Sequence, residues 1–432
     1  MNQRVIQSLY RLIPNDKQLK NIGLLAGSTV IGQVFLVLTS PIISRLYSQA
    51  ELGMFGLVTA FSSIVSVAIT LKYELAIVSA KTEQDAIDLM VFSIFFSVIF
   101  SLFSGTGLFF LIFYNLFNFG AVPYYLIPII LLLNVAISIS FVFRYWFTRK
   151  EMFGIVGKIN LWQGFGRGIG QIVLSPFSGA GLILGETFGR NLGFTLSWKE
   201  SNINKHIHDT LLRKNEALKT LKQYKAFPMF VLPSSIIDIT SIMMPLPIIS
   251  GLYGLEAAGL YSLAQRVMTV PLSLVGSSVA DVFHSQIADL QRSEPQKIMP
   301  AFWVMTRSLT FVGIIPAVIL SLLGEPIFKL VFGAHWSQSG AMVALMSPWM
   351  LAQFIVSPIS RIVLISNKQG VKLFYDITAF IIILVVPYWI HQNGGSVLEA
   401  LFWLSLCKAL SYVLYFLIVW GQARQISLGR IG

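Results

Sequence analysis

The sequence predicts an all-α polytopic membrane protein with about twelve transmembrane helices in two parallel six-helix repeats. Three observations support this prediction. Hydrophobic residues make up 55% of the chain and charged residues only 12%, a balance typical of membrane-spanning proteins. Apolar runs of about 20 residues, the length that crosses a bilayer, recur along the chain. A segment of the first half also returns in the second half.

The predicted spans are the apolar runs that lie between turn signals. They cover residues 21–46, 54–80, 88–113, 122–148, 152–175, 178–198, 226–250, 257–284, 298–323, 341–366, 370–391 and 397–420. With this assignment, the basic residues in the loops and at the span ends fall on the side of the N-terminus, except Arg45 and Lys329. Because short cytoplasmic loops carry an excess of Lys and Arg, both termini and the loop 199–225 are predicted to be cytoplasmic.

These spans divide the chain into five segments. They are a basic cytoplasmic N-terminal segment (1–20), an N-lobe of six spans (21–198), a basic cytoplasmic linker (199–225), a C-lobe of six spans (226–420) and a cytoplasmic tail (421–432). The net charge of +12 then reflects topology and contact with anionic lipids, not nucleic-acid binding. We interpret the linker as a solvated connection between the lobes, with a partner-binding patch as the alternative.

The repeated segment predicts how the two halves are related. Pro41–Leu57 ends the first span and opens the second, and Pro247–Leu263, 206 residues later, does the same for the seventh and eighth; eight of seventeen positions are identical. Chance similarity between two apolar helix ends is the alternative to duplication. Because six spans separate the copies, both cross in the same direction, which predicts parallel repeats. In each copy Gly53 or Gly259 opens the next span, which predicts matching tight hairpins on the outer face.

Several basic residues lie inside the predicted spans. They are Lys72, Arg144, Lys158, Arg167, Arg190, Arg266, Arg307, Arg361 and Lys408. Lys72, Arg144, Lys158 and Arg361 lie near cytoplasmic helix ends, where their side chains can reach the interface. The other five lie near the middle of the membrane, where each costs about 2.5–3.5 kcal/mol if it faces lipid. We therefore expect these five to face counter-ions or a water-filled cavity.

Acidic residues near the middle of the membrane are too few to neutralise these cations. Glu186 precedes Arg190 by four residues, a spacing that places both on one face of a helix and predicts an ion pair. Asp238 is either a salt-bridge partner of Arg266 or a carboxylate that couples transport to protons. The remaining charge predicts a positive interior suited to a large anion such as a phosphate or pyrophosphate.

Glycines at four-residue spacing mark the fifth and sixth spans. They are Gly164/Gly168, Gly166/Gly170 and the row Gly181, Gly185, Gly189 and Gly193. This spacing predicts close packing of the two helices. The segment 164–170 also lacks the spacing of a dinucleotide-binding loop and follows no strand.

Two motifs carry a resemblance to a known family. They are Leu71–Ile77 (Leu-Lys-Tyr-Glu-Leu-Ala-Ile) and Gly259–Val267 (Gly-Leu-Tyr-Ser-Leu-Ala-Gln-Arg-Val), the second followed by Pro271. With the twelve-span pattern, they resemble the Wzx-type O-antigen flippases of the multidrug/oligosaccharidyl-lipid/polysaccharide exporter (MOP) superfamily. Glu325–Trp336 is similar to an amphipathic outer segment common in that family.

The resemblance implies a V-shaped transporter in a bacterial inner membrane. Its substrate would be an undecaprenyl-pyrophosphate-linked oligosaccharide for O-antigen, lipopolysaccharide, capsule or exopolysaccharide synthesis, and its partners would be membrane lipids and polysaccharide polymerase machinery. The resemblance implies a head-group ligand at Arg266 and a family motif at Lys72, Tyr73 and Glu74. Because Lys72 and Glu74 are two apart on a predicted helix, they are expected on nearly opposite faces, with at most one facing the cavity.

The expected mechanism is alternating access without enzymatic chemistry, cofactor or metal. The predicted substrate-binding residues are Arg266, Arg307, Lys408, Arg190 and Arg167. Asp238 and Glu186 are the candidates for coupling to an ion, and the sequence does not select proton over sodium. Two alternatives remain: a cation-coupled drug exporter of the same superfamily, which the basic interior disfavours, and a membrane polymerase or glycosyltransferase, which would need catalytic groups on the short outer loops.

Overall fold

The computed structural model describes residues 16–365 and 369–428, and this part of the chain is helical throughout. The predicted N-terminal segment 1–20 lies mostly outside the described residues. The N-lobe contains α2 (Asp16–Leu46), α3 (Gln49–Ala68), α4 (Tyr73–Ser79), α5 (Glu83–Phe113), α6 (Ile127–Arg149), α7 (Phe153–Val173) and α8 (Gly179–Ser201). The C-lobe contains α11 (Leu232–Met243), α12 (Pro245–Tyr253), α13 (Leu255–Ser293), α14 (Ile298–Phe332), α15 (Ser337–Ile359), α16 (Ile362–Ile365), α17 (Gln369–Gln392) and α18 (Val397–Ser427).

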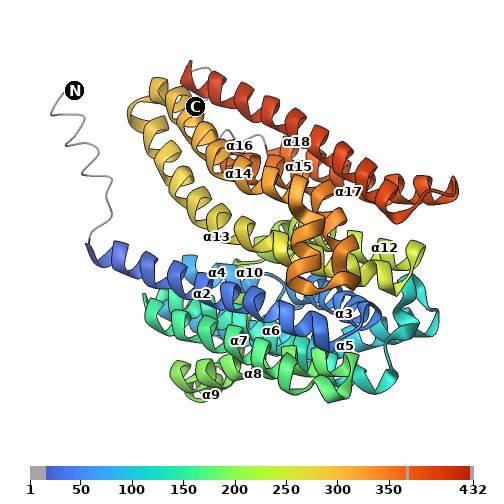
Figure 1. The fold of residues 1–432 in the computed structure, drawn as a ribbon. Helices are drawn as coiled ribbons and strands as arrows, with labels where there is room; N and C mark the ends of the chain where they lie inside the picture. Colours follow the sequence, from blue (N-terminus) through green and yellow to red (C-terminus); the bar gives the residue numbers. More distant parts are fainter. Residues whose placement is uncertain (1–15, 366–368, 429–432) are drawn as a thin grey trace.

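Two short helices, α9 (Ile203–Leu212) and α10 (Lys214–Gln223), connect the lobes. Single turns join several of the long helices. They are η1 (Leu116–Ala121), η2 (Tyr124–Leu126), η3 (Ser175–Phe177), η4 (Phe227–Val231), η5 (Pro295–Lys297) and η6 (Ala334–Trp336). Figure 1 shows the two lobes as separate groups of long, roughly aligned helices.

Each predicted span corresponds, in the described residues, to one helix or to consecutive shorter helices separated by a break. Seven helices of the described chain are long and apolar enough to cross a membrane, or eight if the bent pair formed by α10 and η4–α11 is one span. These are α3, α5, α6, α14, α15, α17 and α18, some of them with an adjoining turn. The chain is therefore a multi-pass helical membrane protein, and the number twelve stays a prediction. The helices α7 and α8 are less apolar, because they carry several glycines and charged residues.

The second predicted span is broken in two. Leu71 and Lys72 adopt positive φ angles of 54° and 62°, so α3 ends and α4 begins in a new direction. The break brings the Lys72 ammonium to 3.5 Å from the Glu74 carboxylate. The expectation that these two side chains point to opposite faces was therefore wrong, because it assumed an uninterrupted helix.

The lobes meet at one end of the molecule, which we call the hairpin end and define by the α2–α3 and α12–α13 connections. Here the repeat glycines make equivalent contacts. A Cβ atom on Gly53 would overlap the carbonyl oxygen of Leu255, and one on Gly259 would overlap that of Gln49. Gln49 and Leu255 are themselves 206 residues apart, so the crossing of α3 and α13 follows the sequence duplication. The predicted matching hairpins are confirmed.

Further hydrogen bonds close the hairpin end. The Ser44 hydroxyl donates to the Phe332 carbonyl at 3.1 Å, and the Trp336 indole donates to the Ser44 carbonyl at 2.8 Å. The Asn118 amide donates to the Ser250 carbonyl at 2.5 Å. In Figure 1 the lobes diverge from this end toward the opposite one, which we call the linker end because it holds α9 and α10.

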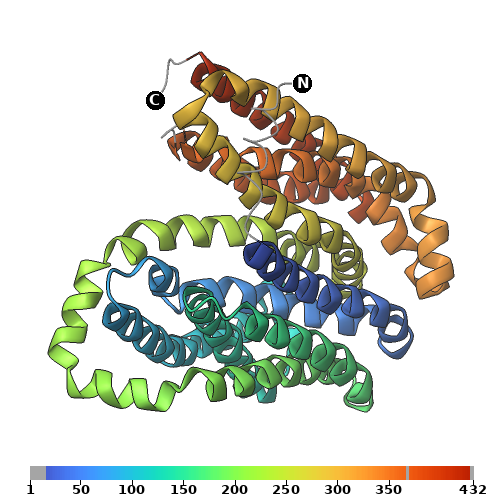
Figure 2. The same cartoon turned by 90° about the vertical axis from the view of Figure 1, so that its left-hand side faces the viewer.

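The linker packs on the N-lobe. In Figure 2 it runs round one side of that lobe before the chain enters the C-lobe. Ile203 and Ala217 are fully buried. The carboxylate of Asp88, on α5 and 2% exposed, accepts hydrogen bonds from Thr210 at 3.2 Å and Thr220 at 3.3 Å and lies 3.5 Å from the Arg213 guanidinium. The linker is thus docked on the N-lobe, in contrast to the solvated connection expected from its composition.

Asp88→Ala is expected to release this linker. The substitution leaves two buried hydroxyls and a guanidinium without their shared acceptor, and hydrogen bonds to a charged group are worth about 1.5–3 kcal/mol. Cleavage of the linker by trypsin, which requires local opening, should therefore accelerate at least about tenfold in detergent-solubilised protein. Glu83→Ala, which removes the half-exposed partner of Lys150, is the control and should change the rate little. Equal rates in both variants would contradict the docking role of Asp88.

Candidate functional site

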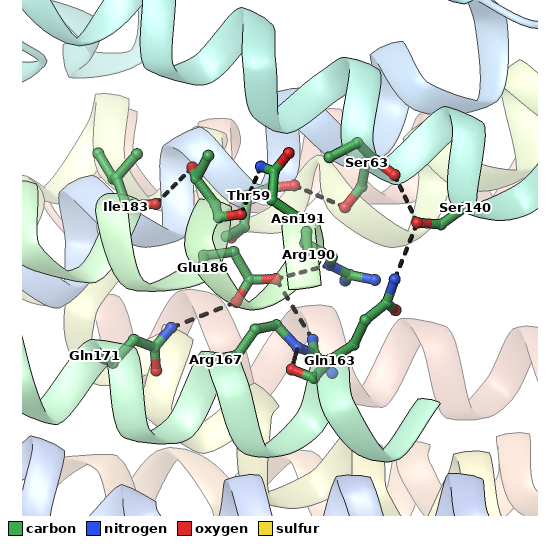
Figure 3. A network of polar contacts seen from close by, with 12 residues as sticks. Thr59, Ser63, Ser140, Gln163, Arg167, Gln171, Ile183, Glu186, Arg190 and Asn191 are labelled. Carbon is green, nitrogen blue, oxygen red and sulfur yellow. Dashed lines mark hydrogen bonds and ion pairs between the residues drawn. The ribbon is translucent and has the colours of Figure 1, made fainter. Parts of the chain in front are cut away.

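A cluster of charged side chains lies inside the N-lobe. Glu186 on α8 accepts a hydrogen bond from the Nε of Arg190, 3.1 Å away on the same helix, and one from Arg167 on α7 at 3.4 Å. Gln171 donates to the other carboxylate oxygen at 3.4 Å. Figure 3 shows the four side chains converging between α7 and α8. The predicted pair of Glu186 and Arg190 is confirmed, and Arg167 joins it.

Close approach of α7 and α8 makes this cluster possible. A Cβ atom on Gly170 would lie 3.0 Å from the Cα of Gly185, and one on Gly166 would lie 2.9 Å from the Cα of Gly189. The predicted glycine packing between these helices is confirmed for these pairs. Gly164 instead faces α2, where a Cβ would lie 2.7 Å from the Cα of Gly32. The glycines therefore draw α2, α7 and α8 together around the charged residues.

Arg266 links this cluster to the C-lobe. It lies on α13, and its guanidinium donates to the Leu36 carbonyl of α2 and to the amide oxygen of Gln171, both at 3.3 Å. Its partners therefore belong to the N-lobe, and the salt bridge with Asp238 considered from the sequence is not the arrangement seen. Through Gln171, the C-lobe arginine is connected to Glu186.

Two adjoining cavities are lined by these arginines. The interlobe cavity, of about 260 Å³, is lined by residues that include Arg167, Arg190, Arg266 and Glu186. The N-lobe cavity, of about 140 Å³, shares Arg167 and Arg190 with it and adds Arg144. Three guanidinium groups against one carboxylate leave the interlobe cavity with a formal charge of +2. Such a wall attracts phosphate groups, which arginine binds through paired N–H donors.

The interlobe cavity straddles the repeat. Positions 206 residues apart on α3 and α13 both line it: Thr59 with Gln265, and Ala60 with Arg266. In each pair, the larger or charged side chain belongs to the second half. The helix positions are thus equivalent in the two halves, while the side chains that carry charge are not.

Two predicted cavity residues lie elsewhere. Arg307 is exposed on α14, on the side away from Phe302, Thr306 and Leu309, which form the buried face of that helix. It lines none of the cavities described here, because the sequence indicates depth along a helix but not the direction of a side chain. Lys408 is 5% exposed and lines a third cavity within the C-lobe.

This C-lobe cavity, of about 400 Å³, is bounded by α11, α13, α15, α17 and α18. Asp238 and Asp376 line it together with Lys408, whose charge they influence. Its wall is rich in aromatic side chains, and the Lys408 ammonium lies 5.6 Å from the centre of the Trp349 ring. One amine and two carboxylates give it a formal charge opposite in sign to that of the interlobe cavity.

The motif residues Lys72, Tyr73 and Glu74 contact the linker and one another, not a cavity described here. Tyr73 donates a hydrogen bond to the Leu221 carbonyl of the linker at 3.2 Å, and its ring stacks on that of Phe96. Glu74 is 2% exposed and pairs with Lys72. None of the three lines the cavities described here. The motif instead joins the break between α3 and α4 to the linker.

Sequence reasoning missed the polar residues that surround the arginines. Gln33, Gln163, Gln171 and Gln265 line the interlobe or N-lobe cavities, and Gln163 donates to the Ser140 hydroxyl at 2.9 Å (Figure 3). Uncharged amides inside apolar spans are the signal that would have identified them. Arg144, expected to extend toward the interface, lines the N-lobe cavity instead.

Comparisons with known proteins agree with this architecture. The chain is 24% identical over 206 residues to the succinoglycan biosynthesis transport protein ExoT of Rhizobium meliloti (strain 1021), an alignment that covers 47% of this chain and 41% of that protein. It is 21% identical to the teichuronic acid biosynthesis protein TuaB of Bacillus subtilis (strain 168) over 37% of this chain and 33% of that protein. The aligned regions thus span less than half of these relatives.

Solved structures share the fold over nearly the whole chain. The lipid II flippase MurJ in an inward closed conformation matches with a TM-score of 0.68 at 15% identity, covering 94% of this chain and 90% of that one. The Vibrio cholerae MATE transporter VcmN matches with a TM-score of 0.61 at 13% identity, covering 95% and 98%. The family model described as polysaccharide biosynthesis protein matches residues 42–341. Because this match covers more than two thirds of the chain, the protein belongs to the polysaccharide biosynthesis protein family, and its helical fold is the one shared with MurJ and VcmN.

Proposed function

We propose that the protein is a flippase that moves a polyprenyl-pyrophosphate-linked oligosaccharide across the bacterial inner membrane for surface polysaccharide synthesis. The observation that carries this proposal is the group of three arginines around a single carboxylate where the two lobes meet. A site of this charge inside a membrane protein suits a pyrophosphate and disfavours cationic drugs. The names of the relatives, which concern succinoglycan transport and teichuronic acid synthesis, support the same substrate class.

The proposed mechanism is alternating access. The linker end, rich in Lys and Arg, faces the cytoplasm under the positive-inside rule, and the start of α2 and the end of α18 lie on that side. The substrate enters where the lobes diverge, and its pyrophosphate binds to Arg167, Arg190 and Arg266 while the lipid tail stays in the bilayer. Separation of the lobes at the hairpin end then releases the head group on the other face. No covalent step is involved.

An ion gradient is the proposed source of energy. Glu186 is neutralised by two arginines in this conformation, so Asp238, on the wall of the C-lobe cavity, is the better candidate for binding a proton or sodium ion. Polysaccharide polymerases are the proposed partners that consume the translocated substrate.

Reconstitution into vesicles tests the function. The probe is the lipid-linked oligosaccharide extracted from a strain that lacks this gene, with a fluorescent group on its sugar that dithionite quenches only from outside. Protein-containing vesicles should make the inner pool accessible much faster than empty ones. If the vesicles expel ethidium and leave the lipid in place, drug export is the function instead. Release of sugar or lengthening of the glycan would indicate an enzyme.

A further inference from the structure

The C-lobe cavity is the counterpart of the N-lobe cavity in the repeat. The N-lobe cavity is built by α2, α6, α7 and α8, which correspond to the first, fourth, fifth and sixth predicted spans. The C-lobe cavity is built by α11, α15, α17 and α18, which correspond to the seventh, tenth, eleventh and twelfth, with α13 added. The two cavities thus occupy equivalent positions in the two halves and differ in their linings.

Both cavities adjoin the interlobe cavity. Gln33, Arg167 and Arg190 belong to the walls of the N-lobe and interlobe cavities alike. Gln265 and Thr269 of α13 belong to the walls of the interlobe and C-lobe cavities. The three cavities are therefore neighbours, with the interlobe cavity in the middle.

The lining of the C-lobe cavity suits a neutral polar ligand. Trp349 and Tyr412 supply aromatic surface, while Gln353, Ser357 and Asp376 supply amide, hydroxyl and carboxylate groups. Lys408 offsets one of the two carboxylates, which leaves the cavity with a formal charge of only −1. Its volume lies in the range of about 300–1,000 Å³ typical of small-ligand sites, which combine apolar and aromatic walls with a few polar groups.

A buried hydrogen-bond donor in the wall of the C-lobe cavity has no acceptor, which is independent evidence for a ligand there. The indole N–H of Trp349 is buried and has no hydrogen-bond partner in the described part of the chain, and the Trp349 side chain is part of the cavity wall. A buried polar group without a partner costs about 1–3 kcal/mol and indicates a missing partner. Neither the Asp88 site nor the Glu186 cluster leaves its central carboxylate without partners in this way.

We propose that the C-lobe cavity is the saccharide-binding site of the transport path and that it holds the sugar next to the pyrophosphate. Sugars present hydroxyls to amides and carboxylates and apolar C–H faces to aromatic rings, the two kinds of group that line this cavity. The arginines at the lobe boundary bind the anionic part of the same molecule. This inference rests on the proposed function, and it adds that recognition of the glycan is assigned to the C-lobe.

The test compares two lipids that differ only in the glycan. One is sugar-free undecaprenyl pyrophosphate, and the other is the undecaprenyl-pyrophosphate-linked oligosaccharide extracted from a strain lacking this gene. Dissociation constants are measured in detergent for the wild type, the double variant Trp349→Phe with Gln353→Ala, and Arg266→Gln. Trp403→Phe, which changes an exposed tryptophan of α18, is the matched control.

The wild type should bind the glycosylated lipid at least about tenfold more tightly than the sugar-free lipid, a factor that corresponds to 1.4 kcal/mol. The double variant should lose this preference and bind sugar-free lipid as the wild type does, whereas Arg266→Gln should weaken both lipids alike. Equal weakening of both lipids by the double variant, or no change, would overturn the saccharide site. If the wild type bound neither lipid, the proposed function itself would fail.

A second measurement does not depend on the double variant folding. Free oligosaccharide, released from the extracted lipid by mild acid, should compete with the glycosylated lipid for the wild type. It should not displace sugar-free undecaprenyl pyrophosphate from the arginine site. Absence of competition with the glycosylated lipid would also overturn the proposal.

Discussion

Arg266→Gln is expected to lower the rate of lipid-linked oligosaccharide translocation by about 10- to 100-fold while leaving the protein folded. Hydrogen bonds to a charged partner are worth about 1.5–3 kcal/mol, and each 1.4 kcal/mol corresponds to a factor of ten. Arg266 forms no ion pair in the described structure; it donates to a carbonyl and an amide oxygen. Its removal therefore leaves no buried carboxylate unpaired. The vesicle assay described above measures the effect.

Arg307→Gln is the matched control for this experiment. It removes the same charge from another helix of the C-lobe, but from the exposed side of α14. Its translocation rate should stay within about twofold of the wild type, since Arg307 lines none of the cavities described above. Arg266→Lys should give an intermediate rate, because lysine keeps the charge but loses the planar pair of donors. Equal losses in Arg266→Gln and Arg307→Gln would mean that net charge, not the position of Arg266, determines transport.

The same substitution also tests how the site controls conformation. Among the described residues, Arg266 connects the C-lobe to the charged cluster of the N-lobe. It donates a hydrogen bond to Gln171, which in turn donates one to Glu186. A pyrophosphate bound to Arg266 would compete with Gln171 and Leu36 for its N–H donors. Binding of substrate would then release the contact that holds the lobes in this conformation, which is the differential interaction that a population shift requires.

The parts of the site that could be predicted from the sequence depend on local spacing. Glu186 and Arg190 are four residues apart on one helix, and that spacing alone places them together. The repeat likewise predicts the hairpins, because equal spacing implies equal position in each lobe. Neither prediction depends on how separate helices are rotated against each other.

The features that the sequence could not place depend on the direction of a side chain. Arg266, Arg307 and Lys408 have similar predicted depths, yet the structure places them in the interlobe cavity, on an exposed helix face and in the C-lobe cavity. When a helix is apolar on all sides, its sequence has no periodic pattern that indicates which side faces the protein interior. The break at Leu71 and Lys72 could not be predicted for another reason. Neither residue type favours the positive φ angle that both adopt.

At the hairpin end, Gly53 and Gly259 allow α3 and α13 to cross closely. Gly53→Ala and Gly259→Ala each place a methyl group against a backbone carbonyl of the opposite lobe. Backbone cannot move aside as a flexible side chain can, so each substitution should cost about 1–3 kcal/mol or more. We expect a lower melting temperature in detergent for either variant. Gly107→Ala, where an added methyl group meets nothing within 4 Å, should melt as the wild type does.

This over-packing should also change the conformational equilibrium, because the crossing of α3 and α13 is tight while the hairpin end is closed. Destabilising the closed arrangement favours any state in which the lobes are apart at this end. Ser44→Cys, in a Cys407→Ser background, reports on the opening, since Ser44 is buried against the Phe332 carbonyl. Its maleimide labelling should be faster with Gly259→Ala than with Gly107→Ala. Unchanged labelling together with a lower melting temperature would mean that the crossing stabilises the fold without acting as a gate, and the lobes would then have to separate by another route.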